Sequence, residues 1–174
     1  MMKASLWRRM RMPSDNPCVI RPARPEDGPR LLSMMRQLAE FEGYAEDFAV
    51  TLEELERRLF VNRDFGVYVA ESDGQAVGML VYYYLPFTYD LTPWVYVKEL
   101  FIEPPYRYLG LGGKLMAALA RECLREGGRK IRWDVLATNE PAAMFYRSQG
   151  AKCEDNWRIF SLNASEISRL AGYE

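Results

Sequence analysis

Histidine is missing from this chain of 174 residues. Its absence excludes Ser-His-Asp and Cys-His nucleophile systems, zinc sites built on imidazole, and the commonest general base near neutral pH. Acid–base chemistry in this protein must therefore come from Glu, Asp, Lys, Tyr, Cys or water. We expect no metal site.

Cysteine is also scarce. The three residues, Cys18, Cys123 and Cys153, are widely spaced, lack CxxC geometry and cannot all form disulfides with one another. This usage favours a reducing cytoplasm. Cys123 falls on the inner side of an amphipathic segment, so we interpret it as a packing residue.

Long apolar runs and an excess of one charge are missing as well. No segment has the length and apolar character of a signal peptide or a membrane span. A net charge of −1 provides no overall field to hold nucleic acid. The hydrophobic share of 49% and the charged share of 27% are typical of a soluble globular protein. We therefore expect neither a nucleic-acid nor a membrane partner.

The first 17 residues are basic and contain Pro13 and Pro17. We expect a disordered tail here. An upstream start codon, with Met10 or Met12 as the true start, and a functional basic arm are the alternatives. Residues 18–174 are predicted to form one domain.

Hydrophobic periodicity and turn residues divide the rest of the chain into short elements. The predicted strands cover residues 18–21, 65–71, 76–85, 94–102 and 131–136. The predicted helices cover 26–41, 51–59, 110–126, 139–149 and 164–170, and a last hairpin covers 151–162. This order predicts an α+β, mixed-sheet domain without an internal linker.

Residues 107–113, Arg-Tyr-Leu-Gly-Leu-Gly-Gly, lie between a predicted strand and a strongly amphipathic helix. Glycine lets the backbone approach a ligand closely, and the free N–H groups of a helix start suit a phosphate or pyrophosphate. The loop is not a P-loop, because Tyr108 stands at the first glycine position and Leu115 follows Lys114 where Ser or Thr is needed. A tight turn without a ligand is the alternative.

A second candidate runs from Asn139 to Tyr146. Asn139 is expected to cap a helix, and Tyr146, two turns later, lies on the same side. A phenol carries its proton near neutral pH and can therefore act as an acid. A core tyrosine beside Phe145 is the alternative.

The two segments occur together and in order. Arg107-x-x-Gly110-x-Gly112 followed by Asn139 to Tyr146 resembles the acetyl-CoA signature of the GNAT acetyltransferase superfamily. The resemblance covers residues 19–162 and is closer still to the diamine (spermidine/spermine) N-acetyltransferase branch. The segments that carry this closer resemblance are Leu38-Ala39-Glu40-Phe41-Glu42, Phe87-Thr88-Tyr89-Asp90, Asn139-Glu140-Pro141-Ala142, Phe145-Tyr146 and Trp157-Arg158-Ile159-Phe160.

The resemblance implies an α/β/α sandwich with the GNAT acyl-CoA N-acyltransferase fold. Its twisted, mostly antiparallel sheet would splay where two central strands run parallel, and acetyl-CoA would bind in the splay. The pantetheine arm would pair with a strand backbone, and the pyrophosphate would lie on loop amides. The implied cofactor-binding residues are Leu100, Phe101, Ile102, Arg107, Tyr108, Leu109, Gly110, Leu111, Gly112, Gly113, Asn139, Ala142 and Tyr146.

The resemblance also implies direct attack by the substrate amine, with Tyr146 protonating the CoA thiolate as it leaves. An alkyl amine has a pKa of about 10 and must first lose a proton. The branch uses a Glu for this step, but that position is Lys98 here and Glu99 matches its neighbour. Because successive strand side chains face opposite ways, Glu99 reaches the same face only through a bulge or register shift. Glu99 and water are the two alternatives for the base.

The acceptor side of the site is implied by a few further positions. Phe41-Glu42 matches the branch's Tyr-Glu pair at the amine, and Lys98 would repel a polycation. Trp157 belongs to the branch's C-terminal hairpin, which helps to build the dimer and the substrate cleft. The candidate substrate-binding residues are Phe41, Glu42, Asp90, Lys98 and Trp157. Glu46 and Asp47 are either further acids at this mouth or ordinary solvated side chains.

The resemblance therefore implies a homodimeric N-acetyltransferase, and the cysteine usage favours a cytoplasmic one. We expect it to move an acetyl group from acetyl-CoA to a primary amine of a small molecule, of the polyamine, diamine or lysine-analogue type. A peptide or protein amine as the acceptor is one alternative. A non-catalytic acetyl-CoA-binding module is the other.

Overall fold

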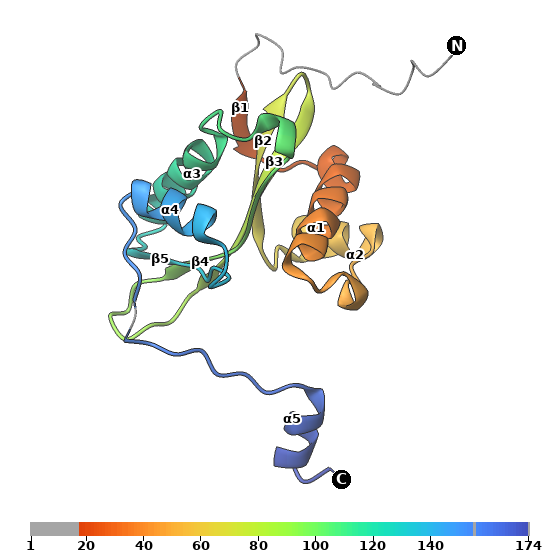
Figure 1. The fold of residues 1–174 in the computed structure, drawn as a ribbon, viewed down its shortest axis with the longest axis vertical. Helices are drawn as coiled ribbons and strands as arrows, with labels where there is room; N and C mark the ends of the chain where they lie inside the picture. Colours follow the sequence, from red (N-terminus) through yellow and green to blue (C-terminus); the bar gives the residue numbers. More distant parts are fainter. Residues whose placement is uncertain (1–17, 155, 174) are drawn as a thin grey trace, which may run out of the picture. The chain divides into compact units, whose positions relative to one another are not determined.

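The structure is a computed structural model that describes residues 18–154 and 156–173 (Figure 1). The basic segment 1–17, for which the sequence predicts a tail, lies outside the described residues. The chain divides into two compact units, Met1–Leu136 and Ala137–Glu174, and each is described by itself. No described helix combines the length and apolar character that crossing a membrane requires.

A five-stranded sheet runs through the first unit in the order β1-β2-β3-β4-β5. Neighbouring strands from β1 to β4 pair antiparallel, and β4 pairs parallel with β5. The mixed, mostly antiparallel sheet that the sequence predicts is thus confirmed. The strands are β1 (Val19–Pro22), β2 (Gly66–Ser72), β3 (Gln75–Leu85), β4 (Trp94–Ile102) and β5 (Lys130–Arg132).

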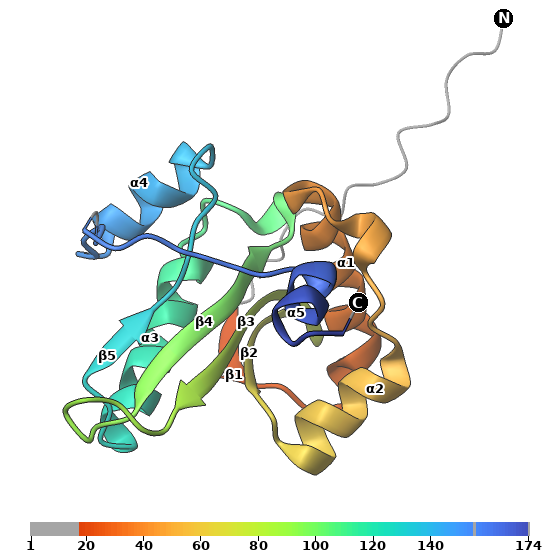
Figure 2. The same ribbon diagram turned by 90° about the horizontal axis from the view of Figure 1, so that it is seen from below.

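Helices cover both faces of this sheet (Figures 1 and 2). α1 (Gly28–Glu42) and α2 (Leu52–Glu56) pack on one face, and α3 (Leu111–Arg125) packs on the other. α2 continues into a π-helical segment, η3 (Arg57–Asn62). The described part of this unit also contains three 3-10 turns: η1 (Pro25–Asp27), η2 (Ala45–Asp47) and η4 (Pro104–Tyr106).

The buried apolar side chains form two clusters, one on each face of the sheet. The cluster under α1 and α2 includes Leu31, Met34, Met79 and Phe101. The cluster under α3 includes Val95, Val97, Leu115, Leu119 and Cys123. Burial of each large aliphatic side chain stabilises the fold by about 1.5–3 kcal/mol. Cys123 is 3% exposed and burial raises the pKa of its thiol, so its interpretation as a packing residue is confirmed.

β4 and β5 pair only where both strands begin. Trp94, Val95 and Tyr96 lie opposite β5, and the pairing ends there. The strand predicted over 131–136 is therefore three residues long, and the chain leaves the sheet before Asp134, whose carboxylate accepts a hydrogen bond from the Tyr96 hydroxyl. Beyond Tyr96, β4 keeps β3 as its partner on the other side. This parting of two parallel strands is the predicted splay.

The second unit contains α4 (Glu140–Ser148) and α5 (Ala164–Leu170). The hairpin predicted over 151–162 is wrong, because residues 151–154 and 156–162 form no strand. An alternating apolar pattern becomes a strand only when a neighbouring strand satisfies its backbone groups. Here the backbone closes a turn instead, from the Trp157 N–H to the Glu154 carbonyl at 3.2 Å, and the Trp157 and Phe160 side chains are exposed.

Candidate active site

A β-bulge in β4 decides which of its side chains face α1. Val97 and Glu99 pair with consecutive residues of β3, so Lys98 between them has no residue opposite. Val97 packs under α3, whereas Phe101 packs under α1. Glu99, two residues before Phe101 in the regular part of the strand, therefore faces α1. The bulge that the sequence analysis required for Glu99 is present.

Glu99 carries a carboxylate into the interior of the first unit. Its Oε2 atom is enclosed and has no hydrogen-bond partner among the described residues. Burial raises the pKa of Glu99 to about 7; the Lys98 ammonium opposes this rise, and the Glu42 carboxylate adds to it. A carboxyl group with this pKa changes its protonation state near neutral pH, as a general base requires.

The C-terminal end of α1 faces this carboxylate. Glu42 is the last residue of α1, and Gly43 ends the helix with a φ of 85°. Tyr44 follows, and burial together with the charges of Glu99 and Glu42 raises the pKa of Tyr44 to about 12. Its phenol therefore keeps its proton at neutral pH. We call Glu42, Tyr44, Lys98 and Glu99 the acceptor cluster.

Tyr44 is a member of this cluster that the sequence analysis missed. Its signal in the sequence is its place directly after Glu42-Gly43, because a glycine that ends a helix turns the next side chain back toward the core. Phe41, which the resemblance places at the amine, is 62% exposed. Glu46 and Asp47 are exposed in the turn that follows Tyr44.

Asp90 has a different setting from the acceptor cluster. Its carboxylate accepts hydrogen bonds from the Thr88 hydroxyl at 2.6 Å, the Thr92 hydroxyl at 2.9 Å and the Thr92 N–H at 3.1 Å. These bonds lower the pKa of Asp90 to about 2. The carboxylate thus holds the β3–β4 loop in shape, and its contact with a substrate stays a prediction.

The start of α3 offers the backbone groups that an anion needs. Gly110 is the N-cap residue with a φ of 74°, and no side chain among the described residues caps the helix. The N–H groups of Leu111, Gly112 and Gly113 therefore lack partners within the helix. Together with the positive end of the helix dipole, they fit a phosphate or pyrophosphate.

Arg107 and Tyr108 shape the loop before this helix start. The Arg107 Nε donates a hydrogen bond to the Ile102 carbonyl at 2.9 Å, and its guanidinium lies 5.7 Å from the centre of the Phe101 ring. Arg107 therefore ties the loop to the end of β4. Tyr108 has a φ of 65° and is fully exposed, so the loop turns sharply at a residue other than glycine.

The backbone of residues 100–102 completes this arrangement. Within the first unit, β5 does not extend along this part of β4, so one edge of the strand has no neighbour. An extended ligand can add to such an edge through main-chain hydrogen bonds. The strand edge and the helix start together fit a long ligand that carries a pyrophosphate, as CoA does.

The remaining predicted residues belong to the second unit. The Asn139 Oδ1 accepts a hydrogen bond from the Ala142 N–H at 3.2 Å, so the predicted helix cap is confirmed. Tyr146 is half-buried in α4, and its ring centre lies 5.0 Å from that of Phe145. Trp157 is 68% exposed. The roles of Asn139, Ala142 and Tyr146 toward CoA stay predictions.

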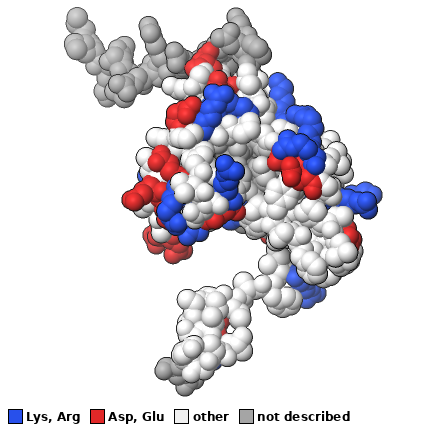
Figure 3. Space-filling model, turned by 180° about the vertical axis from the view of Figure 1, so that it is seen from behind, with Lys and Arg blue, Asp and Glu red and all other residues white. Residues whose placement is uncertain are grey.

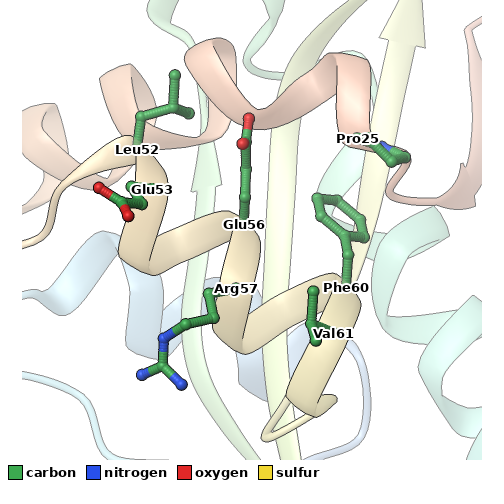
Figure 4. Close-up of a pocket in the computed structure, with 7 residues that line it drawn as sticks. All are labelled: Pro25, Leu52, Glu53, Glu56, Arg57, Phe60 and Val61. Atoms are coloured by element: carbon green, nitrogen blue, oxygen red, sulfur yellow. The ribbon is translucent and has the colours of Figure 1, made fainter.

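The surface has two further features. An open groove of about 600 Å³ beside α2 contains none of the predicted site residues (Figure 4). Its lining consists of Pro25, Leu52, Glu53, Glu56, Arg57, Phe60 and Val61. On the face drawn in Figure 3, basic and acidic side chains are interspersed, and neither sign forms a continuous patch.

Known proteins resemble this chain in sequence and fold. Residues 32–151 match the Acetyltransferase (GNAT) family. A thialysine N-epsilon-acetyltransferase of Mus musculus is 30% identical over 164 residues, which cover 88% of this chain and 96% of that protein. The spermidine/spermine N(1)-acetyltransferase-like protein 1 of Homo sapiens is 27% identical over 95% of this chain and 25% of its own length.

A solved structure shows the same fold. AAC(6')-Iy, in complex with the bisubstrate analog CoA-S-monomethyl-acetylneamine, superposes with a TM-score of 0.71 at 20% identity, over 86% of this chain and all of that one. The match to the family covers more than half of the 174 residues. The chain belongs to the GNAT family and is an N-acetyltransferase.

Proposed function

We propose that this enzyme transfers an acetyl group from acetyl-CoA to a primary amine of a small molecule, of the polyamine, diamine or lysine-analogue type. The observation that carries the proposal is the Glu99 carboxylate, which faces α1 with one oxygen enclosed and unpartnered among the described residues, and whose pKa burial raises to about 7. The names of two relatives support the acceptor class, since thialysine and spermidine/spermine are small amines.

Acetyl-CoA supplies the activated acetyl group. In this proposal its pantetheine arm pairs with the backbone of Leu100, Phe101 and Ile102, and its pyrophosphate lies on the amides of residues 108–113. The open strand edge and the helix start without a side-chain cap support these assignments. Asn139 and Ala142 hold the cosubstrate near its thioester.

The reaction then needs three proton transfers. Glu99 accepts a proton from the protonated acceptor amine, because only the neutral amine has a free electron pair. The amine nitrogen forms a bond to the acetyl carbon as the carbon–sulfur bond breaks, and the nitrogen then loses its surplus proton to solvent. The departing thiolate takes a proton from Tyr146, which recovers one from solvent. No acyl-enzyme is formed, in keeping with the buried Cys123 and the absence of histidine.

The experiment that tests this function mixes the full chain with acetyl-CoA and a panel of amines. The panel holds diamines, polyamines, lysine analogues, aminoglycosides and a lysine-containing peptide, and the release of free CoA thiol is measured. We expect release with one of the small amines. Release with the peptide alone would favour a protein acceptor, and acetyl-CoA binding without release from any amine would contradict the proposal.

Tyr146→Phe tests the acid. The change removes one hydroxyl, so kcat is expected to fall about 100-fold, the low end for general acid catalysis, with little change in acetyl-CoA affinity. Tyr173→Phe is the matched control, because Tyr173 is exposed and lies in the same unit. An unchanged kcat in Tyr146→Phe would reject Tyr146 as the acid.

The proposal includes a homodimer in the cytoplasm, and both rest on the family resemblance and the cysteine usage. Light scattering of the purified chain is expected to give twice the mass of one chain. A monomer mass at working concentration would contradict the dimer. A fluorescent fusion found outside the cytoplasm would contradict the location.

A further inference from the structure

The acceptor cluster contains one cation in addition to its two carboxylates. The bulge in β4 places Lys98 beside Glu99, and its ammonium is near enough to lower the pKa of Glu99. Lys98 is exposed, whereas one oxygen of Glu99 is enclosed. The cluster therefore has an inner end formed by an acid and an outer end that carries a positive charge.

Glu42 supplies a negative charge that is also exposed and close enough to Glu99 to act on its pKa. It is the exposed last residue of α1, and its charge raises the pKa of Glu99 and of Tyr44. A ligand at the outer end thus meets a cation from β4 and an anion from α1. Two opposite charges on facing elements favour a ligand that itself carries both charges.

A diamine and a diamino acid differ at this outer end. Each brings a primary amine to Glu99, but the far end of a diamine is a second ammonium, which Lys98 repels. The far end of a diamino acid is an α-carboxylate with an α-ammonium, which complement Lys98 and Glu42. We propose that Lys98 is a specificity-determining residue that binds the α-carboxylate of a diamino acid, with Glu42 facing its α-ammonium. This inference rests on the proposed amine acetylation and names its acceptor class.

A role for Lys98 that is limited to lowering the pKa of Glu99 predicts different kinetics. If Lys98 acts only by lowering the pKa of Glu99, its replacement changes the rate for every acceptor by the same factor. If Lys98 binds a carboxylate, its replacement changes kcat/KM only for acceptors that carry one. The ratio of two acceptors therefore separates the two roles, whereas a single rate does not.

The test uses pairs of acceptors that differ by the α-carboxylate alone: lysine with cadaverine, and ornithine with putrescine. Lysine amide is a third control, since it keeps the size of lysine and loses the negative charge. For the unmodified enzyme, kcat/KM is expected to be on the order of tenfold higher for each amino acid than for its diamine, the effect of one good charge pair at a partly exposed site.

Variants of Lys98 then test whether this residue causes the preference for amino acids over diamines. Lys98→Gln is expected to bring the lysine-to-cadaverine ratio close to one, and Lys98→Glu to reverse it. Lys98→Arg keeps the positive charge and is expected to keep the preference. Arg129→Gln is the matched control, because it removes one exposed positive charge just before β5, outside the cluster, and should leave the ratio unchanged.

Two outcomes overturn the inference while leaving acetylation intact. One is a preference of the unmodified enzyme for the diamines, and the other is an equal effect of Lys98→Gln on lysine and cadaverine. If no amine releases CoA thiol, the proposed function fails instead. Calorimetry of lysine and cadaverine binding to the CoA-loaded chain then tests Lys98 directly. Tighter binding of lysine that Lys98→Gln abolishes supports the inference, and equal or absent lysine binding overturns it.

Discussion

Two carboxylates in the first unit, those of the buried Asp27 and the half-buried Glu99, have opposite surroundings. Asp27 accepts two hydrogen bonds from the Arg21 guanidinium, at 2.7 and 2.9 Å, and one from the Arg24 N–H at 2.7 Å. Burial alone would raise the pKa of Asp27, but these bonds and the charge of Arg21 lower it. Glu99 keeps an enclosed oxygen without a partner among the described residues, and its pKa rises to about 7.

The difference shows that the partner, and not burial alone, decides what a buried acid does. Arg21 lies in β1 and also pairs with Glu71 of β2 at 2.5 Å, so Asp27 ties η1 to two strands. Desolvation of Asp27 is compensated in the folded state. Desolvation of Glu99 is not compensated in this way. The resulting free-energy cost weakens the fold, and it also raises the pKa of the carboxylate, which makes it a good proton acceptor at neutral pH.

Removal of the Glu99 charge is expected to have the largest effect on activity. Glu99→Gln keeps the shape of the side chain but cannot accept a proton, so kcat/KM should fall about 100- to 10,000-fold. The rise of kcat/KM with pH, which we expect near pH 7, should disappear with it. Acetylation rates across a pH series check both results.

The stability of Glu99→Gln shows whether a loss of activity comes from the missing base or from a damaged fold. A neutral amide in place of an unpartnered carboxylate should leave the melting temperature unchanged or raise it. Glu53→Gln, at an exposed acid of α2, is the control for the charge change and should keep full activity. Full activity in Glu99→Gln would instead identify water as the base.

Asp27→Asn is expected to show the reverse behaviour. An amide cannot satisfy the guanidinium as a carboxylate does, so the free energy of unfolding should fall by about 3 kcal/mol, the lower end for a broken buried pair because Glu71 remains. Urea denaturation measures this loss. The activity of the molecules that stay folded should not change.

An exposed ion pair provides the control for Asp27→Asn. Glu54 pairs with Arg57 at 2.7 Å and Arg58 at 2.6 Å on the surface of α2, and these partners lower the pKa of Glu54 to about 2. Exposed pairs contribute little to stability, so Glu54→Gln should scarcely shift the urea midpoint. Equal losses in the two variants would contradict the distinction drawn for Asp27.

The elements of the first unit could be predicted because their signals are local. The apolar periodicity of α1 and α3 and the Asp73-Gly74 turn between β2 and β3 require no knowledge of distant residues. The structure of residues 151–162 could not be predicted in this way, because their apolar alternation predicts a strand but does not show whether a partner strand is present. The strand at 131–136 was predicted too long for a similar reason, since β5 (Lys130–Arg132) ends where it leaves its neighbour β4.

The bulge at Lys98 was foreseen only as a condition for Glu99 to face the acceptor. A stronger signal was present in the sequence. Apolar residues of β4 under α3 occupy odd positions at Val95 and Val97 but even positions at Leu100 and Ile102, and such a change of parity requires one extra residue. The pKa of Glu99 could not be predicted, because burial and the charge of Glu42 depend on how α1 packs.

The two carboxylates should also give stability opposite dependences on pH. The pKa of Glu99 is about 7 in the folded chain against an ordinary 4.5, so between these values the folded state holds a proton that the unfolded chain has lost. Stability from this group is therefore present below the unfolded pKa and falls, by at most about 3 kcal/mol, as pH rises toward 7. The lowered pKa of Asp27 gives stability above its unfolded pKa that is lost as pH falls.

Urea unfolding of the enzyme and of Glu99→Gln across the same pH series isolates the Glu99 contribution. The free energy of unfolding of Glu99→Gln should exceed that of the unmodified enzyme by more at neutral pH than in mild acid. Asp27→Asn should instead reduce the loss of stability in acid. A constant difference between the enzyme and Glu99→Gln at every pH would show that Glu99 has an ordinary pKa.

The smallest expected effect concerns the cation beside Glu99. The Lys98 ammonium lowers the pKa of Glu99 against the effect of burial, so Lys98→Gln should move the rise of kcat/KM to higher pH. Because kcat/KM reports the free enzyme, the shift should appear with any acceptor, whether or not it carries a carboxylate. Lys98→Arg keeps the charge and should keep the original profile. A profile that stays in place in Lys98→Gln would mean that this ammonium lies too far from Glu99 to act on it, and of these two charges the Glu42 carboxylate would then be the one that tunes the base.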